Sequence, residues 1–251
     1  HAYIFQQPDG RIVFAIPYER DFTLIGTTDL LYEGDLDDVA ISPKEIAYLI
    51  EAASRYFSSA ITEDEIVSSY SGVRPLYEDH AASNSTVTRD YVFELDNEGG
   101  APILSVYGGK ITTYRKLAEH ALEKLGRVLA LPGKAWTANA PLPGGDMPDG
   151  DFAAFLWRIS ERYEWLPPEM LLRLARAYGT RIEAVIGSAG SLGELGAHMG
   201  GNLYEAELRY LFDAEYARTA QDVLWRRSKL GLHLPVGAQQ AVADWFAAQT
   251  S

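Results

Sequence analysis

A stretch rich in proline and glycine divides this chain into two parts with different residue patterns. Residues 132–150 contain four prolines and four glycines, which interrupt regular elements. Before this stretch, β-branched and aromatic runs alternate with turn residues, and after it apolar residues recur at helical spacing. We therefore predict an α+β fold. A mainly antiparallel sheet with helices occupies residues 1–131, a linker residues 132–150, and an all-α domain residues 151–251.

The first part opens with strand signals. Residues 11–18 and 22–28 predict an antiparallel hairpin, and residues 1–6 predict a further strand beside it. Residues 42–57 then predict a helix that faces the core. Ser42 is placed as its N-cap, with Pro43 at the first helical position and Glu45 completing a capping box.

More strands are predicted before the linker, at residues 66–70, 86–95 and 102–107. The last of these is a continuous apolar run, which is typical of a strand covered on both faces. A helix is expected over residues 112–125.

In the second part, strand signals disappear and five segments predict helices. A loop is expected where glycine recurs every third residue, from Gly187 to Gly196. Four tryptophans fall within helical patterns and are predicted to lie in the core: Trp157, Trp165, Trp225 and Trp245. The predicted helices span residues 152–163, 168–178, 203–218, 220–232 and 238–248.

Charge and composition narrow the function classes. Of the 251 residues, 35 are acidic and 22 basic, so the formal net charge is −13. That balance argues against a general nucleic-acid surface or an anionic-membrane surface. The absence of cysteine excludes disulfides and thiolate metal sites, and the histidines lack metal-ligand spacing. No apolar run approaches the roughly 18 residues of a membrane-spanning helix.

Two glycines between the last predicted strand and its helix form the first candidate site. Gly108 and Gly109 allow a ligand to approach the backbone, and Lys110 adds a positive charge beside the free N–H groups of the helix. This is not a Walker loop, because Leu104 stands at the first glycine position and Ile111 follows the lysine. The alternative is a tight strand–helix turn with a solvated lysine.

A lone arginine is the second candidate. Arg74 precedes Pro75 in the sequence SGVRPL, where a stiff backbone would project its guanidinium into a cleft suited to phosphate or carboxylate. The alternative is a structural salt bridge. The segment 26–29 (GTTD) is a third candidate, either a turn in which Asp29 caps a backbone group or part of a cleft lining.

These runs resemble a known family. SYSGVRPL (69–76), TRDY (88–91), LSVYGGKITTYRKLAEHALEKL (104–125) and AIPYERDFTLIGTTD (15–29) are similar to the C-terminal half of FAD-dependent (aerobic, respiratory) glycerol-3-phosphate dehydrogenases. Shorter matches follow in order through the helical part: AWT, LPGG, YEAEL and LWRRSKLG. The resemblance covers essentially the whole chain.

The resemblance implies a reaction and a set of partners. Enzymes of this family oxidise sn-glycerol 3-phosphate to dihydroxyacetone phosphate by hydride transfer to FAD, and the electrons pass to quinone. They are peripheral proteins on the cytoplasmic face of the cell membrane, and the resemblance allows a homodimer. By resemblance, Arg74 binds substrate, and Lys110 lies at the junction of flavin and substrate. The backbone of Gly108, Gly109, Ile111 and Thr112 then lies against the flavin ring.

The family's dinucleotide fingerprint GxGxxG does not occur in this sequence. We therefore expect the chain to be part of a longer protein, and by itself to hold no FAD tightly and to be inactive. Arg74 is a poor base because a guanidinium stays protonated, and Lys110 could serve only if burial and neighbouring cations favoured its neutral form. The alternatives are a glycerol-3-phosphate oxidase, with oxygen as the acceptor, and a non-catalytic anion-binding or interaction module.

Overall fold

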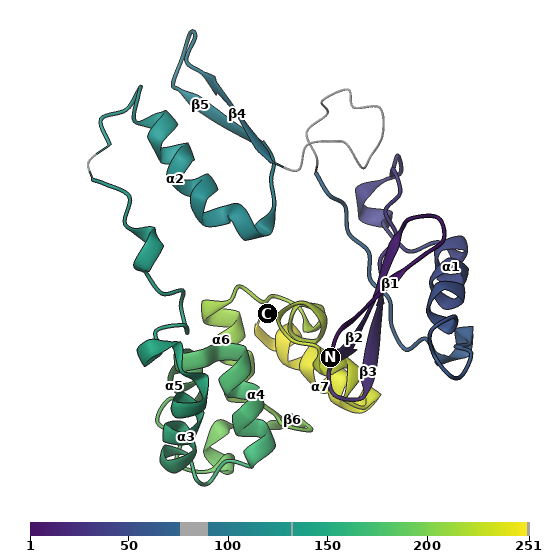
Figure 1. Ribbon diagram of the computed structural model, residues 1–251. Coiled ribbons are helices and arrows are strands. Elements are labelled where there is room, and N and C mark those ends of the chain that lie inside the picture. The colour runs from purple at the N-terminus through teal and green to yellow at the C-terminus, as the bar shows by residue number, and fades with distance from the viewer. Residues whose placement is uncertain (76–89, 132, 250–251) are drawn as a thin grey trace. The chain divides into compact units, whose positions relative to one another are not determined.

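The computed structural model describes residues 1–75, 90–131 and 133–249. It divides into two compact units, residues 1–140 and 141–251. Figure 1 shows strands with a few helices in the first unit and packed helices in the second, which confirms the predicted α+β class. Each unit is described by itself.

The first unit begins with a three-stranded antiparallel sheet. Strands β1 (Tyr3–Gln6), β2 (Ile12–Tyr18) and β3 (Phe22–Gly26) lie in that order, which confirms the predicted hairpin and the strand beside it. Phe5 stands opposite Val13 in the register. Their side chains and that of Ala15 are buried against Ala52, so alternate residues of the sheet form a small core.

Helix α1 (Pro43–Ser54) covers that core and begins where its sequence predicts. The Ser42 side chain accepts the backbone N–H of Glu45, and a Glu45 carboxylate oxygen accepts the backbone N–H of Ser42. This reciprocal pair satisfies two of the N–H groups that a helix start leaves without partners.

A hairpin and a helix form the rest of the first unit. Strand β4 (Tyr91–Asp96) pairs in antiparallel register with β5 (Ile103–Gly108), and α2 (Tyr114–Leu125) follows. Residues 86–89 of the predicted strand lie outside the described residues. Strand β5 is not covered on both faces by the described residues, because Ile103 is 62% exposed and Val106 44%. Within the described ranges β5 pairs with β4 alone.

The strand predicted at residues 66–70 is also absent. The segment is irregular, with Val67 64% and Tyr70 71% exposed. A strand requires a neighbouring edge, and no described segment pairs with these residues. Its β-branched and aromatic residues favour a strand, but the described residues offer them no strand to pair with. The short 3₁₀ turns of the unit are Leu36–Asp38, Glu63–Glu65, Ile111–Thr113 and Thr137–Asn139.

The second unit is built around one apolar core. Its α-helices are α3 (Phe152–Arg162), α4 (Pro168–Tyr178), α5 (Ile182–Ile186), α6 (Glu205–Ala214) and α7 (Val236–Gln249), and Asp222–Arg227 forms a π-helix. The core includes Ile159, Leu174, Leu208 and Val242, one from each of four helices. Further 3₁₀ turns lie at Pro148–Gly150, Gly179–Arg181, Leu192–Leu195 and Leu230–Leu232.

The second unit also holds a short ribbon that the sequence did not predict. Strands β6 (His198–Gly200) and β7 (Leu203–Tyr204) pair in antiparallel register. Gly200, the last residue of β6, and Gly201, which follows it in the reversal, have φ of 117° and 53°, values that favour glycine.

Three of the four tryptophans were predicted correctly. Trp165, Trp225 and Trp245 pack partly buried against the core, but Trp157 is 65% exposed. Helix α3 buries Phe155 and Ile159, which lie four residues apart on one face. Trp157 is two residues from each of them and therefore lies on the opposite face.

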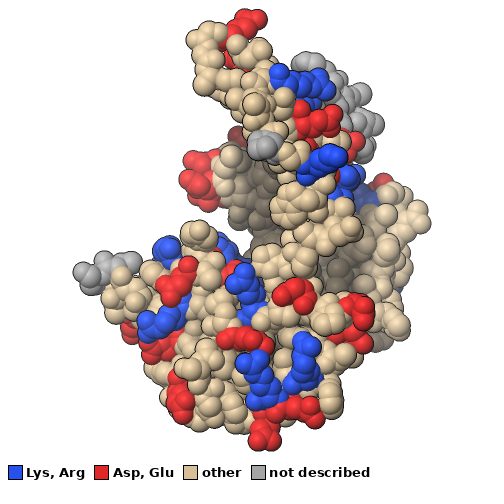
Figure 2. Space-filling model, turned by 90° about the vertical axis from the view of Figure 1, so that its left-hand side faces the viewer, with Lys and Arg blue, Asp and Glu red and all other residues tan. Residues whose placement is uncertain are grey.

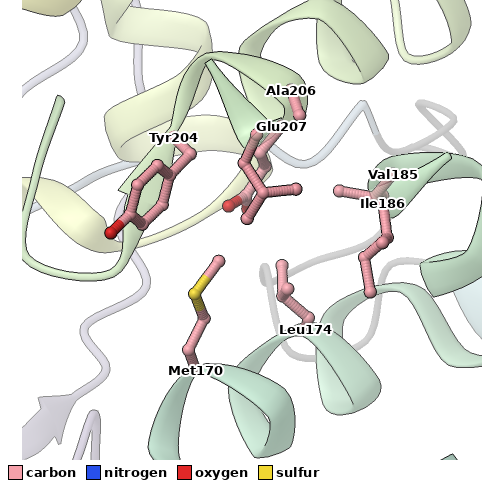
Figure 3. Close-up of a pocket in the computed structure, with 8 residues that line it drawn as sticks. Met170, Leu174, Val185, Ile186, Tyr204, Ala206 and Glu207 are labelled. Atoms are coloured by element: carbon pink, nitrogen blue, oxygen red, sulfur yellow. The ribbon is translucent and has the colours of Figure 1, made fainter. Parts of the chain in front are cut away.

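The cavity in this core is too small for an organic ligand. It measures about 10 Å³ and is lined by side chains such as Met170, Leu174 and Ile186 (Figure 3). That volume is about what one water molecule needs. Among the described residues, no helix has the length and apolar character needed to cross a bilayer.

Candidate functional site

Two of the sequence candidates meet in the first unit. Arg74 Nη1 lies 2.6 Å from Asp29 Oδ2, so the arginine of SGVRPL is joined to the acidic end of GTTD. The two side chains are 49% and 52% exposed. The salt bridge considered for Arg74 is therefore present, and the Asp29 carboxylate takes part in it.

The loop that carries Asp29 is held by α1. Thr28 Oγ1 donates to Glu45 Oε1 at 2.6 Å, while Glu45 Oε2 accepts the Ser42 N–H at 2.9 Å. The Thr28 hydroxyl, followed by the Ser42 N–H, lowers the pKa of Glu45 below its ordinary value. The carboxylate that caps the helix therefore also fixes the residue next to Asp29.

Arg74 keeps donors for a ligand. A guanidinium has five N–H groups, and the bond to Asp29 engages Nη1. Within the described part of the chain, Arg74 makes no other hydrogen bond or ion pair. Its half-exposed guanidinium can therefore present further N–H groups to an anion, and phosphate and carboxylate are the groups that match its planar geometry.

The glycine pair lies where β5 ends. Gly108 and Gly109 have φ of 69° and 98°, in the region that favours glycine. A Cβ added to Gly109 would lie 3.3 Å from the Cβ of Tyr91 on the paired strand. The backbone conformation therefore favours glycine there, and a side chain would also crowd Tyr91.

Lys110 follows the glycines and starts the turn that leads into α2. Its carbonyl accepts both the N–H and the hydroxyl of Thr113, at 2.9 and 2.8 Å. Ile111 is 89% exposed, and Thr112 is exposed beside it. The first N–H groups of a helical turn have no partner within it, so this exposed turn offers donors. The Lys110 side chain is exposed and forms no ion pair among the residues that the structure describes.

A second carboxylate anchors α2. Thr137 Oγ1 donates to Glu119 Oε1 at 2.5 Å, Arg115 donates to the same oxygen at 3.0 Å, and Lys116 donates to Oε2 at 2.9 Å. The Thr137 hydroxyl and Lys116 lower the pKa of Glu119 to about 2. Reasoning from local sequence missed this network, because Thr137 lies 18 residues from Glu119. The available signal was the AWT motif that contains Thr137.

Among the described residues, no hydrogen bond or ion pair joins Arg74 to the turn at Gly108–Thr112. Arg74 precedes residues 76–89, and Lys110 follows them. On the face that Figure 2 shows, Lys and Arg side chains are interspersed with Asp and Glu. With a net charge of −13, attraction of an anion would rest on local groups such as Arg74 and not on a broad basic face.

Two protein-family descriptions match successive parts of the chain. Residues 1–115 match the family described as FAD dependent oxidoreductase. Residues 135–250 match the family described as the C-terminal domain of alpha-glycerophosphate oxidase.

Curated relatives match along nearly the whole chain. A glycerol-3-phosphate dehydrogenase of Pseudomonas aeruginosa is 47% identical over 98% of this chain, and the aerobic glycerol-3-phosphate dehydrogenase of Escherichia coli is 46% identical over 99%. A D-erythritol 1-phosphate dehydrogenase of Brucella abortus is 46% identical over 98%. The matches cover 48%, 50% and 49% of these three proteins, so the chain spans about half the length of its relatives.

Proposed function

The chain belongs to the family of FAD-dependent oxidoreductases, and on that premise we propose that it is part of an enzyme that oxidises sn-glycerol 3-phosphate to dihydroxyacetone phosphate. The observation that carries the proposal is the Arg74 guanidinium, half exposed and held by Asp29 with donors to spare. A small substrate that carries a phosphate dianion suits that group.

Arg74 supplies the anchoring contact in this proposal. Two parallel N–H···O bonds to the phosphate would fix one end of the substrate and thereby the direction of its carbon chain. Hydrogen bonds to charged groups contribute about 1.5–3 kcal/mol each. Aligning the rest of the substrate with the electron acceptor then costs less orientational freedom than it would without this anchor.

The turn at Gly108–Thr112 fits a flat, hydrogen-bonding cofactor ring. Its glycines present bare backbone and its exposed N–H groups can face ring acceptors, which agrees with the FAD dependence of the family. When bound, FAD supplies the hydride acceptor. We assign Gly108, Gly109, Ile111 and Thr112 to backbone contacts with that ring, where N–H groups stabilise developing negative charge.

Lys110 has an electrostatic role in this scheme. Its side chain is exposed beside the glycine turn. A charged lysine between cofactor and substrate stabilises the phosphate and the reduced ring.

We also propose that this chain alone does not turn over. It has no GxGxxG fingerprint and spans about half of each relative. The ADP part of FAD would be held by residues outside it. Residues 1–131 would belong to the flavin- and substrate-binding domain, and residues 151–251 would form a helical domain joined by the linker 132–150.

The remaining partners belong to the same proposal. Electrons would pass from the reduced flavin to quinone, on the cytoplasmic face of the cell membrane, where the whole protein is peripheral. A homodimer is compatible with this arrangement. If oxygen were the acceptor instead, the same residues would serve a glycerol-3-phosphate oxidase, because the substrate half of the reaction is unchanged.

A second substrate has a specific observation in its favour. The D-erythritol 1-phosphate dehydrogenase of Brucella abortus is 46% identical to this chain, as similar as the glycerol-3-phosphate dehydrogenases. Both substrates are polyol phosphates, so Arg74 would hold the same phosphate in either. The choice between them depends on the space for one extra carbon beyond the reacting hydroxyl.

Flavin absorbance under anaerobic conditions tests the proposal. The full-length flavoprotein that contains this chain is mixed with glycerol 3-phosphate and, separately, with D-erythritol 1-phosphate. Faster bleaching by glycerol 3-phosphate supports the first substrate, and the reverse order supports the second. Rapid reoxidation when oxygen is admitted indicates an oxidase, and reoxidation by a soluble quinone alone indicates a dehydrogenase. Retained oxidised flavin with both substrates would favour the non-catalytic module.

A further inference from the structure

The ion pair between Asp29 and Arg74 contributes little to stability. Both side chains are about half exposed, and exposed pairs contribute little to stability because water and salt screen them. Yet the pair joins residues 45 apart in the sequence, at 2.6 Å. Its main effect is therefore geometric, since it fixes the direction of one guanidinium.

The Asp29 side of the pair is anchored. Thr28 is bonded to Glu45, which is in turn bonded to Ser42 at the start of α1. The loop after β3 is thus tied to a capped helix, and the carboxylate of Asp29 projects from a fixed position.

At Arg74 the backbone is restricted, whereas the long side chain has many rotamers. A residue that precedes proline is largely confined to extended conformations, and Pro75 follows Arg74. The arginine side chain, however, has several rotatable bonds and loses rotamer entropy when it is ordered. The bond to Asp29 removes much of that freedom before any ligand arrives.

We propose that Asp29 is a positioning residue that holds the Arg74 guanidinium ready for the substrate phosphate. This inference rests on the proposed function, in which Arg74 binds that phosphate. Asp29 engages Nη1 and leaves the other N–H groups to pair with two phosphate oxygens. Since the ordering cost is met in the free protein, binding is tighter than an unrestrained arginine would give.

The proposal predicts a particular kinetic pattern. Loss of a contact that helps substrate and transition state equally raises KM and leaves kcat nearly unchanged. If Asp29 instead competed with the substrate for Arg74, its removal would change KM in the opposite direction. A carboxylate that competes with the substrate for Arg74 would, once removed, lower KM.

The experiment compares Asp29→Ala, Asp29→Asn and Asp29→Glu in the full-length flavoprotein. Asp29→Asn keeps the size of the side chain and secures a result if the alanine variant folds poorly. Asp9→Ala is the matched control. It removes an Asp–Arg pair of the same 2.6 Å distance and similar exposure, 42% and 47%, that lies at the turn between β1 and β2. Steady-state KM and kcat for glycerol 3-phosphate are measured together with the Kd for inorganic phosphate by calorimetry.

The expected result is a rise of about tenfold in KM and in the phosphate Kd for Asp29→Ala, within the range that misplaced binding groups cause. Asp29→Asn gives a smaller rise, Asp29→Glu a partial rescue, and Asp9→Ala no change. Unchanged or lower values of KM and Kd in Asp29→Ala would overturn the positioning role. If the wild type binds phosphate but does not oxidise glycerol 3-phosphate, the proposed function fails, and the phosphate Kd values alone decide the role of Asp29.

Discussion

Thr28 donates a 2.6 Å hydrogen bond to Glu45, so one carboxylate holds both the start of α1 and the loop after β3. Glu45 Oε2 completes the cap of α1, and Oε1 accepts the Thr28 hydroxyl from the loop after β3. The position of the loop that carries Asp29 therefore depends on the first turn of a helix.

Thr28→Val should raise the pKa of Glu45 toward its ordinary value of 4.5, because the Thr28 hydroxyl is the largest cause of its lowering. A carboxyl group with a lowered pKa stabilises the fold above its unfolded-state pKa, and this contribution disappears as the pH falls through the folded-state value. The variant should therefore lose about 0.5–1.5 kcal/mol at pH 7. The loss should shrink at acid pH. NMR titration of the Glu45 carboxyl tests the pKa change, and urea unfolding at pH 7 and at acid pH tests the loss of stability. An unchanged Glu45 titration would contradict the prediction.

Gly109→Ala should destabilise the first unit by about 1–3 kcal/mol through backbone strain and crowding against Tyr91. Gly99→Ala is the matched control, because Gly99 also has a positive φ, 76°, but open space around it. The thermal unfolding midpoint should fall further for Gly109→Ala than for Gly99→Ala. Equal shifts would mean that the contact with Tyr91 does not restrict this position.

Thr137→Val should raise the pKa of Glu119 from about 2 toward 4.5, because the Thr137 hydroxyl is its strongest partner. The stabilisation that the ionised Glu119 gives is present above pH 4.5 and lost as the pH falls toward 2. Less of it should remain in the variant near pH 3. Thr113→Val is the control, since that hydroxyl bonds to the Lys110 carbonyl. NMR titration measures the pKa of the Glu119 carboxyl in both variants. Equal pKa shifts in the two would refute the claim that the Thr137 hydroxyl is the main cause of the lowered pKa.

Glu207→Gln should destabilise the second unit by roughly 3 kcal/mol, because it removes the buried carboxylate charge that pairs with the largely buried Arg173 guanidinium. Glu207 is 2% exposed, and it accepts both Nη groups of Arg173 and the Tyr178 hydroxyl. Glu183→Gln breaks an exposed pair with Arg162 and should cost less than about 1 kcal/mol. Urea unfolding followed by tryptophan fluorescence compares them, and similar midpoints would contradict the account.

Local sequence signals predicted those elements whose causes are local. Ser42, Pro43 and Glu45 lie within four residues and determine where α1 begins. The alternation of Val13 and Ala15 with exposed neighbours likewise defined β2. Where the structure depends on distant partners, the same reasoning failed. Residues 66–70 have strand-forming side chains but no described edge to pair with, and the apolar run of β5 is partly exposed.

The candidate site was predictable as a set of residue types and not as a set of contacts. Gly108, Gly109 and Arg74 could be selected from their neighbours in sequence. The bond from Arg74 to Asp29 spans 45 residues, and the bond from Thr28 to Glu45 spans 17, so no local pattern specifies them. The two oxygens of a carboxylate explain why a recognised capping residue could still have an unrecognised second role.

The most direct test of the account is the concentration dependence of flavin reduction by glycerol 3-phosphate, without oxygen, in the full-length flavoprotein and its Arg74→Ala variant. We predict that the wild-type flavin bleaches with saturation. The ratio of the limiting rate to the half-saturating concentration should fall at least about 100-fold in the variant, since about 3 kcal/mol of charge-assisted hydrogen bonding is lost. A wild-type flavin that stays oxidised, or an Arg74→Ala variant that is reduced as efficiently as the wild type, would contradict the assignment of Arg74 to the substrate phosphate.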